Sequence, residues 1–534
     1  MSGVRAGTVR PSTGPSLNQD TTYALNYHEA TKHSEISIQT SAHYLDWANK
    51  PSQFKIYEGL ASVALPRNFP RQETAPLSAI SGQLLHTREQ NLGLTELSEL
   101  LYFSAGLTRK YRFGSEIHYM RAASATGALY PIELYVVAGD VAGLEAGVYH
   151  FDPLGFQLSR IRAGDHRPVL AQVSNDGIAA APATIAFTSL AWKNAWKYEA
   201  RSYRHWFWDG GVIAANLIAV SSSIGLRSRI VQGFVDQTVN DLLGLRDGKE
   251  ATILLSPVGP ETQRSTDRSA KNFDLILPKV RSLSNEETEY AGIWEAHRAS
   301  FLRNRDEVDR WTDLRLAPVP SAQTTNPVFR LAPPMTEAKK SRTLGEVILQ
   351  RGSSRRFDRS SITFSELSTV LRTSTGPILR DYLPDDDNLI DAYLIANAVE
   401  GLAPGSYFYA REHESLEQLN PGEFRQMSAY LCLGQPLFGD ASVVFFLMTR
   451  LRDVLGALGN RGYRTAQFEG GIVAGKIYLS AYSLGLGASG STFYDDAVSE
   501  FFSPHAKKKS TMIVVGLGVP AYKARSGRVL PQFT

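Results

Sequence analysis

The sequence predicts an α+β protein built from two copies of one fold and preceded by an N-terminal arm. Its 534 residues, 43% of them hydrophobic, are enough for large cores and for two to four domains. From about residue 77, patterns typical of amphipathic helices and of strands recur in the second half of the chain. A recurrence of this length indicates a repeated structural unit.

Three sequence blocks carry the repeat, each without a gap. Chance does not place three such blocks in the same order, so we interpret the chain as a tandem. The blocks are Thr95–Ser98 with Ser104–Gly106, Tyr135 with Gly147 and Tyr149, and Tyr203–Arg204 with Gly210–Gly211 and Gly225–Leu226, which recur as Ser365–Ser368 with Ser374–Gly376, Tyr393 with Gly405 and Tyr407, and Tyr463–Arg464 with Gly470–Gly471 and Gly485–Leu486.

Composition and the repeat together divide the chain into five segments. Residues 1–20, rich in Ser, Thr, Gly and Pro, are predicted to be a disordered tail, and residues 21–76 an ordered arm. The two domains are predicted over residues 77–283 and 336–534. Residues 284–335 between them contain a helical pattern and then several prolines, which stiffen a linker because proline fixes φ and removes a backbone donor.

Charge, hydropathy and cysteine content argue against several classes of protein. The net charge is only +3 and no basic stripe is interleaved with aromatics, so nucleic-acid binding is not expected. The N-terminus lacks an apolar signal core and no apolar run could span a bilayer, so we expect a cytoplasmic protein without a membrane segment. Cys432 is the only cysteine and is expected in the core. His28 and His33 are five residues apart and share no helix face, so no metal site is predicted.

Arg351, Ser353 and Arg355 stand at alternate positions, where two guanidinium groups and a hydroxyl can converge on one phosphate. A solvated basic turn is the alternative. The stretch that follows, residues 362–376, resembles the opening of the FMN-dependent nitroreductase superfamily. In that family, such arginines and serine hold the 5′-phosphate of the flavin, so the resemblance implies FMN as cofactor. Arg525 and Arg528 are placed like the family's last phosphate ligand.

The resemblance also implies an architecture. Each domain would be a mostly antiparallel sheet packed by helices, that is, a tandem of nitroreductase-like domains. Members of the superfamily are usually homodimers with flavin in the subunit interface, so the tandem would form an intramolecular pseudo-dimer. Residues 27–67 resemble the N-terminal extension of tandem SagB-type dehydrogenases.

Residues 485–490 fit the pattern G-x-G-x-x-G, but a dinucleotide fingerprint follows a strand and opens a helix. Here the pattern follows a helix-like run, so we reject the Rossmann interpretation. The segment instead resembles the G-L-G loop of the superfamily. That resemblance places the backbone of Gly485, Leu486, Gly487 and Ala488 at the flavin ring, where glycine allows close approach.

Residues 121–131 resemble the family loop R-x-x-P-S-x-G-x-x-Y-P, which lies against the isoalloxazine of the flavin held by the other subunit. The resemblance therefore assigns Ser124, Ala125, Thr126 and Gly127 to the cofactor site. The match is imperfect, because Ser124 stands where proline is usual and Ala125 where serine is usual. An ordinary turn before a strand is the alternative.

Lys197 and Tyr198, within residues 193–204, resemble the K-Y element of the SagB and cyanobactin-oxidase branch, whose members aromatise azolines in ribosomal peptides. The resemblance implies that the two residues are the catalytic acid/base pair. Free tyrosine and lysine titrate near ~10 and ~10.4, so either needs burial or a neighbouring charge to act near neutral pH. The alternative is a plain helix in which Arg201 and Arg204 form ion pairs.

The expected function is FMN-dependent dehydrogenation of azolines to azoles, or a similar C–N or C–C dehydrogenation, in a peptide natural-product pathway, with oxygen regenerating the flavin. A cyclodehydratase partner and a peptide or small-molecule substrate are expected. Two alternatives stay open: an NAD(P)H-dependent reductase of nitro, quinone or enone compounds, and a flavin-free pseudo-dimer that binds a peptide.

The repeat predicts one composite cofactor site per chain. The phosphate-binding residues of the second half correspond to Ser81, Gln83 and Leu85 in the first, which cannot bind phosphate in the same way. Conversely, Gly127–Pro131 correspond to Asp385–Leu389, where three carboxylates would repel a reduced flavin.

Overall fold

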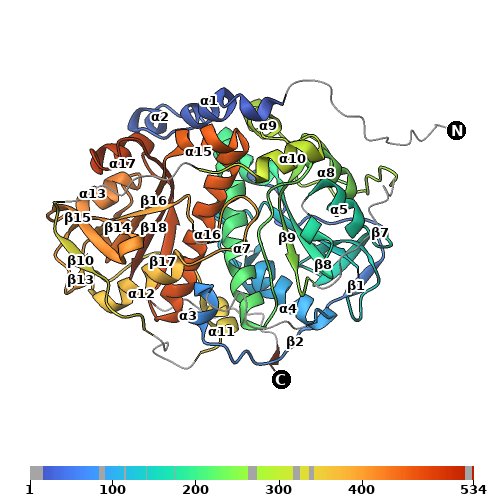
Figure 1. Ribbon diagram of the computed structural model, residues 1–534, viewed down its shortest axis with the longest axis horizontal. Coiled ribbons are helices and arrows are strands. Elements are labelled where there is room, and N and C mark those ends of the chain that lie inside the picture. Colours follow the sequence, from blue (N-terminus) through green and yellow to red (C-terminus); the bar gives the residue numbers. More distant parts are fainter. Residues whose placement is uncertain are drawn as a thin grey trace.

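Two antiparallel sheets flank a pair of long central helices in the computed structural model (Figure 1). The structure describes residues 16–82, 91–113, 116–139, 141–174, 176–261, 273–316, 325–335, 342–385, 387–522 and 532–533. None of the helices in these ranges is long and apolar enough to cross a membrane.

The first sheet has six strands in the order β1-β7-β6-β5-β8-β9, and every neighbouring pair is antiparallel. The arm supplies the edge strand β1. The strands are β1 (Ser62–Ala64), β5 (Ile132–Ala138), β6 (Gly147–Asp152), β7 (Gln157–Ala163), β8 (Ala183–Leu190) and β9 (Glu250–Val258). The helices of this half are α3 (Pro76–Ser81), α4 (Leu94–Ala105), α5 (Arg167–Val173), α6 (Ala191–Tyr198), α7 (Ser202–Ser223) and α8 (Asp236–Leu243).

The second sheet has seven strands in the order β10-β15-β14-β12-β16-β18-β17 and is also antiparallel throughout. Its strands are β10 (Val328–Arg330), β12 (Asp391–Ala396), β14 (Gly405–Ala410), β15 (Ser415–Pro421), β16 (Val443–Thr449), β17 (Gly487–Ser491) and β18 (Ser510–Gly518). The helices are α11 (Leu344–Gln350), α12 (Phe364–Ser374), α13 (Arg425–Leu431), α14 (Pro436–Asp440), α15 (Leu451–Leu458), α16 (Arg461–Ser483) and α17 (Asp495–Phe501).

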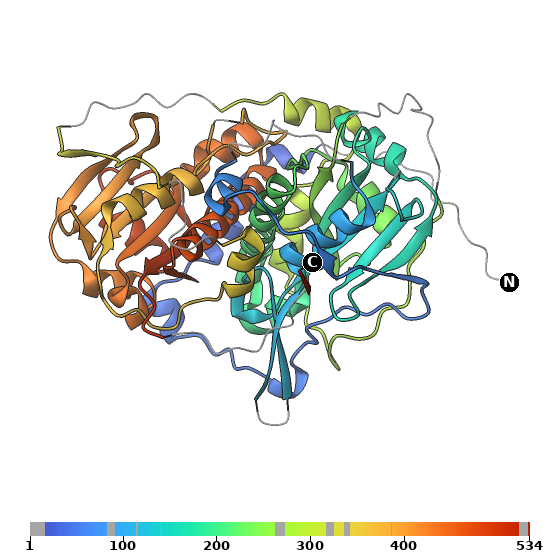
Figure 2. The ribbon, with the colours of Figure 1, turned by 90° about the horizontal axis from the view of Figure 1, so that it is seen from below.

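Among the described residues, three strand pairs lie outside the two sheets. The hairpin of β3 (Leu107–Phe113) and β4 (Glu116–Arg121) projects from the body of the molecule (Figure 2). The other two pairs are parallel: β11 (Ile362–Thr363) with β13 (Val399–Glu400), and β2 (Asn68–Phe69) with β19 (Gln532–Phe533). The last pair ties the end of the second half to the arm.

The repeated Gly-x-Tyr pattern forms the same structure in both halves. Gly147 begins β6 and Gly405 begins β14, and an added Cβ would lie 2.7 Å from a backbone oxygen of the neighbouring strand in each case. The hydroxyls of Tyr149 and Tyr407 donate to the carbonyl four residues earlier, at 2.8 and 2.6 Å. The prediction of two copies of one α+β fold is confirmed.

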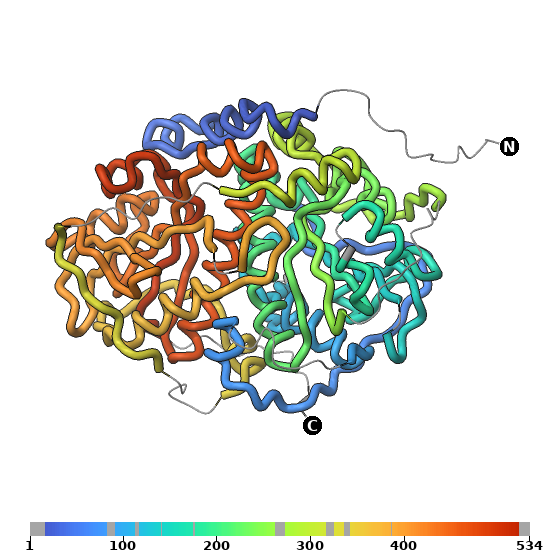
Figure 3. The backbone as a smooth tube through the Cα atoms, viewed as in Figure 1, coloured from blue at the N-terminus to red at the C-terminus, as the bar shows by residue number. Residues whose placement is uncertain are grey.

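The central helices α7 and α16 lie side by side and join the halves (Figures 1 and 3). The glycine pair that recurs in the sequence is the reason that they approach so closely. A Cβ on Gly211 would lie 2.5 Å from the carbonyl oxygen of Phe468, and one on Gly471 would lie 2.7 Å from that of Trp208. Because these obstacles are backbone atoms, only glycine fits, and the two halves form the predicted intramolecular pseudo-dimer.

Two buried ion clusters cross between the halves in a symmetric arrangement. Asp236, the first residue of α8, pairs with Arg461 and Arg464 of α16, both at 2.7 Å. Asp495, the first residue of α17, pairs with Arg201 at 3.0 Å and with Arg204 at 2.6 Å. The ion pairs proposed for Arg201 and Arg204 as an alternative are therefore present.

The arm lies across both halves, with α1 (Thr22–Ala30) beside α9 (Ala291–Ala299) and α15, and continues through α2 (Glu35–Gln39) (Figure 1). Tyr27 donates to the Ala200 carbonyl of the first half at 2.7 Å, and the Asn18 side chain accepts from the Arg461 amide of the second at 2.7 Å. Asn18 belongs to a 3-10 helix, Leu17–Gln19, which lies within the segment predicted as a tail.

The segment predicted as linker is more structured than its prolines suggested. Its described residues, 284–316 and 325–335, contain two helices, α9 and α10 (Arg305–Thr312), where one was expected. Its strand β10 pairs with β15 and extends the second sheet. Cys432 is buried and free, as expected.

Candidate functional site

The loop predicted to face the flavin ring meets the predicted acid/base pair. Tyr198 ends α6, and Gly127 sits in a turn with φ of +64°. A Cβ on Gly127 would lie 2.7 Å from the Tyr198 hydroxyl oxygen. Glycine is thus required twice, for its left-handed backbone and for the space that Tyr198 occupies.

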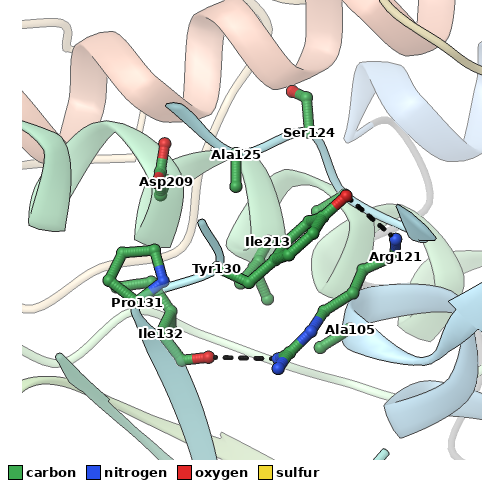
Figure 4. Close-up of a pocket in the computed structure, with 10 residues that line it drawn as sticks. Ala105, Arg121, Ser124, Ala125, Tyr130, Pro131, Ile132, Asp209 and Ile213 are labelled. Atoms are coloured by element: carbon green, nitrogen blue, oxygen red, sulfur yellow. Dashed lines mark hydrogen bonds between the residues drawn. The ribbon is translucent and has the colours of Figure 1, made fainter. Parts of the chain in front are cut away.

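The loop itself is held in a sparsely populated conformation. Besides Gly127, Ala128 and Tyr130 have positive φ of +55° and +51°, which is uncommon for residues with a side chain. Arg121 braces the loop, since its amide donates to the Tyr130 hydroxyl at 3.3 Å and its guanidinium donates to the Ile132 carbonyl at 3.4 Å (Figure 4). Strain of this kind concentrates at functional sites, which favours a binding loop over an ordinary turn.

Beneath the loop lies a small pocket that is mainly apolar (Figure 4). Two of the predicted cofactor residues, Ser124 and Ala125, contribute to its wall. The full lining consists of Ala105, Arg121, Ala123, Ser124, Ala125, Tyr130, Pro131, Ile132, Asp209 and Ile213.

Asp209 of α7 is a site residue that sequence reasoning missed. Its Oδ1 accepts hydrogen bonds from the Thr126 amide at 2.9 Å and from the Thr126 hydroxyl at 2.8 Å. The side chain is buried, and burial raises the pKa of its carboxyl to about 7. The sequence did contain a signal for it, because Asp209 is the only acidic residue in the aromatic run that precedes Gly210–Gly211.

The predicted G-L-G segment lies in the second half, between α16 and β17. Helix α16 ends at Ser483, Gly485 follows it with φ of +80°, and Gly487 begins β17. The pattern therefore follows a helix and opens a strand, which confirms the rejection of a dinucleotide fingerprint. A Cβ on Gly487 would overlap the Ser354 hydroxyl, and the Ser354 amide donates to the Ala488 carbonyl at 2.9 Å. Leu486, between the two glycines, is buried.

The three predicted phosphate ligands occupy different environments. Arg351 is buried, and its Nε and Nη2 donate to the carbonyls of Ala122 and Arg121 at 2.9 and 3.0 Å. It thereby ties the second half to the first-half loop. The Ser353 hydroxyl lies 3.3 Å from that of Tyr478.

Arg355 is exposed, and among the described residues no protein group accepts from its guanidinium, which leaves that group available to an anion. Arg525 and Arg528, the remaining predicted ligands, lie outside the described residues.

Positive charge from both halves gathers around Lys197 and Tyr198. Burial lowers the pKa of Lys197, and the cations Arg355 and Lys50 lower it further. Burial raises the pKa of Tyr198, as does Asp209, against the opposing effect of Arg355. Arg355 belongs to the second half and Lys197 to the first, so the tertiary structure unites the two predicted elements. No group of His, Cys, Asp and Glu in the described ranges could hold a metal ion.

At the position related to this site by the repeat, described residues of the second half pack against Glu469. Glu469 of α16 stands, like Asp209, immediately before a glycine pair. Its carboxylate accepts from the Leu389 amide at 2.6 Å and pairs with Arg380 at 2.8 Å. Tyr382 is fully buried there, with its hydroxyl 3.3 Å from Glu469. The loop before β12 therefore packs as a plug where the loop before β5 leaves a pocket.

The sequence model of the Nitroreductase family matches the chain twice, over residues 90–259 and 348–518. The chain belongs to this family. The two matches contain the two sheets almost entirely, so the repeat seen in the fold is a tandem of nitroreductase domains.

Three similar proteins illustrate the relationship. A protein of Methanocaldococcus jannaschii named as a nitroreductase, MJ1384, is 31% identical over 170 residues, which are 32% of this chain and 81% of that protein. Trifolitoxin-processing protein TfxB of Rhizobium leguminosarum bv. trifolii is 32% identical over 143 residues, 25% of this chain but only 38% of that protein. A solved structure from Anabaena variabilis, also named as a nitroreductase, has a TM-score of 0.71 and 24% identity, and the match covers 93% of this chain and 99% of that one. The last similarity extends the shared fold to nearly the whole chain.

Proposed function

We propose that this oxidoreductase uses FMN to dehydrogenate azolines to azoles in a peptide, as SagB-type enzymes do. The observation that carries the proposal is the position of Tyr198 beside Gly127, with the Lys197 ammonium 5.3 Å from the centroid of the Tyr198 ring and Arg355 of the second half close enough to lower the pKa of Lys197. Processing of a peptide is also what the printed name of TfxB describes for that relative.

The residues present fit FMN. A flavin phosphate needs cationic and hydroxyl donors, and Arg355 with Ser353 would supply them. The Ser354 hydroxyl beside Gly487 is buried and has no hydrogen-bond partner among the described residues, so it could donate to or accept from a ligand. The flavin ring needs a flat surface without protruding side chains, which the loop from Ser124 to Gly127 would offer from the first half and Gly485 to Ala488 from the second.

Bound FMN would supply the hydride acceptor, and molecular oxygen is the terminal oxidant of the proposal. In the azoline, the Cα–H bond breaks, its electron pair forms the new double bond, and a hydride leaves the adjacent ring carbon. A base must take the Cα proton. Lys197 suits this role because its lowered pKa enlarges the neutral fraction at neutral pH.

Tyr198 has the opposite character. Its raised pKa keeps the hydroxyl protonated, so it would act as an acid or as a donor that orients the substrate. The pair thus divides the two roles, since burial disfavours the charged form of each side chain.

The test is turnover of an azoline-containing peptide by Lys197→Ala and Tyr198→Phe. Both variants should retain flavin and lose ~10²- to 10⁴-fold in rate, the usual cost of removing a general acid or base. Tyr149→Phe is the matched control, because it removes a tyrosine hydroxyl that lies outside the proposed site and donates to the Glu145 carbonyl of a strand turn. Wild-type rates in the double variant would contradict the proposal.

Membership of the Nitroreductase family also supports a second candidate function, that of an NAD(P)H-dependent reductase of nitro, quinone or enone compounds. Purified protein mixed with NADPH under anaerobic conditions separates the two functions. Fast bleaching of the visible flavin absorption would favour the reductase, and a flavin that NADPH leaves oxidised would favour the dehydrogenase. A colourless protein that cannot be reconstituted with FMN would contradict both.

A further inference from the structure

We propose that Asp209 is a positioning residue of the cofactor site: it holds the loop of Ser124 to Gly127 in place through Thr126 and sets a negative charge behind that loop. The inference rests on the proposed FMN-dependent function. It concerns binding and redox potential of the flavin rather than turnover of the substrate.

The geometry of Thr126 is the first support. One carboxylate oxygen, Oδ1, accepts from both the amide and the hydroxyl of Thr126, at 2.9 and 2.8 Å. These two bonds join the middle of α7 to the start of the strained turn at Gly127 and Ala128. A turn with consecutive left-handed residues persists only when its surroundings hold it, and Asp209 is the group that does so from within the helix pair.

The comparison with Glu469 is the second support. Both acids hold the loop that precedes a central strand of their own half. Glu469 has a cation, Arg380, at 2.8 Å, whereas no cation among the described residues pairs with Asp209. The other oxygen of Asp209, Oδ2, receives only a long bond from Asn194 at 3.5 Å.

A buried carboxyl without a cation is costly to the fold, because the hydrogen bonds from Thr126 and Asn194 replace only part of the hydration that burial removes. Asp209 is only 3% exposed and lies in the wall of the pocket (Figure 4). In the first half, which has the pocket, Asp209 is not paired with a described cation. In the second half, where the loop packs as a plug, Arg380 neutralises Glu469. This difference points to a role of the charge in the pocket itself.

The experiment compares FMN binding and midpoint potential in wild type, Asp209→Ala and Asp209→Asn. Asp209→Ala removes the acceptor for Thr126, so the Kd for FMN should rise by ~10- to 100-fold, the range for losing a hydrogen bond to a charged group. Asn keeps an acceptor oxygen, so Asp209→Asn should bind FMN nearly as wild type does. Its midpoint potential at alkaline pH should be more positive, because a negative charge that disfavours the reduced flavin is gone.

Glu469→Gln is the matched control at the plugged position. It should lower the unfolding temperature, since Arg380 loses its partner, and leave the potential unchanged. If Asp209→Asn also leaves the midpoint potential unchanged, and Asp209→Ala binds FMN like wild type, the role assigned to Asp209 is wrong while the proposed function stands. A wild-type protein that takes up no FMN would overturn both.

Discussion

Gly127→Ala should impair the proposed acid/base pair more than it impairs the fold. The new methyl group would lie 2.7 Å from the Tyr198 hydroxyl oxygen and 3.2 Å from its Cε2. Ordinary contacts of a Cβ begin at 3.4 Å, so the hydroxyl must move by about 0.7 Å. The Tyr198 ring cannot move away freely, because it already packs edge-on against the His205 ring, with 4.6 Å between the two ring centroids.

Two costs can be estimated for this variant. A left-handed alanine costs about 1–2 kcal/mol of folding free energy relative to glycine, partly offset by the smaller entropy of the unfolded chain. Displacing a catalytic group by a large fraction of an ångström lowers turnover by roughly 10- to 100-fold. The assays are chemical denaturation for the first cost and peptide dehydrogenation under saturating FMN for the second.

Gly59→Ala isolates the backbone cost. Gly59 has φ of +74° and nothing within 4 Å of an added Cβ, so the variant loses folding free energy through the left-handed backbone alone, without a steric clash. We expect similar losses of stability in both variants and a loss of turnover in Gly127→Ala alone. Equal turnover in the two would refute the inferred contact between the loop and Tyr198.

Two further predictions concern the whole tandem. Flavin released by denaturation should approach one FMN per chain at saturation, because Tyr382 and Arg380 fill the second position; a ratio near two would show that the plug opens. Asp495→Asn should cost about 3–5 kcal/mol of unfolding free energy, since Arg201 and Arg204 stay buried without their counter-charge. Its neighbour Asp496→Asn removes an exposed pair with Lys32 and should stay within about 0.5 kcal/mol of wild type; equal losses in the two variants would argue against the buried cluster.

Local backbone requirements could be predicted from the sequence. The Gly-x-Tyr turns of the two sheets, and the glycine pairs of the central helices, occur where a side chain has no room, so the same residues recur in both halves. The run before Gly485 was likewise predicted to be helical, and it forms the end of α16. Periodicity and glycine spacing therefore determined the tandem fold and located the candidate loops.

Partners distant in the sequence were decided only by the tertiary structure. Arg351 was expected at a phosphate, but two of its donors bind carbonyls 229 and 230 residues away. The contact of Asp209 with Thr126 spans 83 residues, and the ion pair of Arg204 with Asp495 spans 291. A guanidinium or carboxyl carries no local signature of its partner, because its hydrogen bonds depend on which elements pack together. The sequence thus determined which residues are capable of chemistry, and the packing of α7 against α16 decided which of them meet.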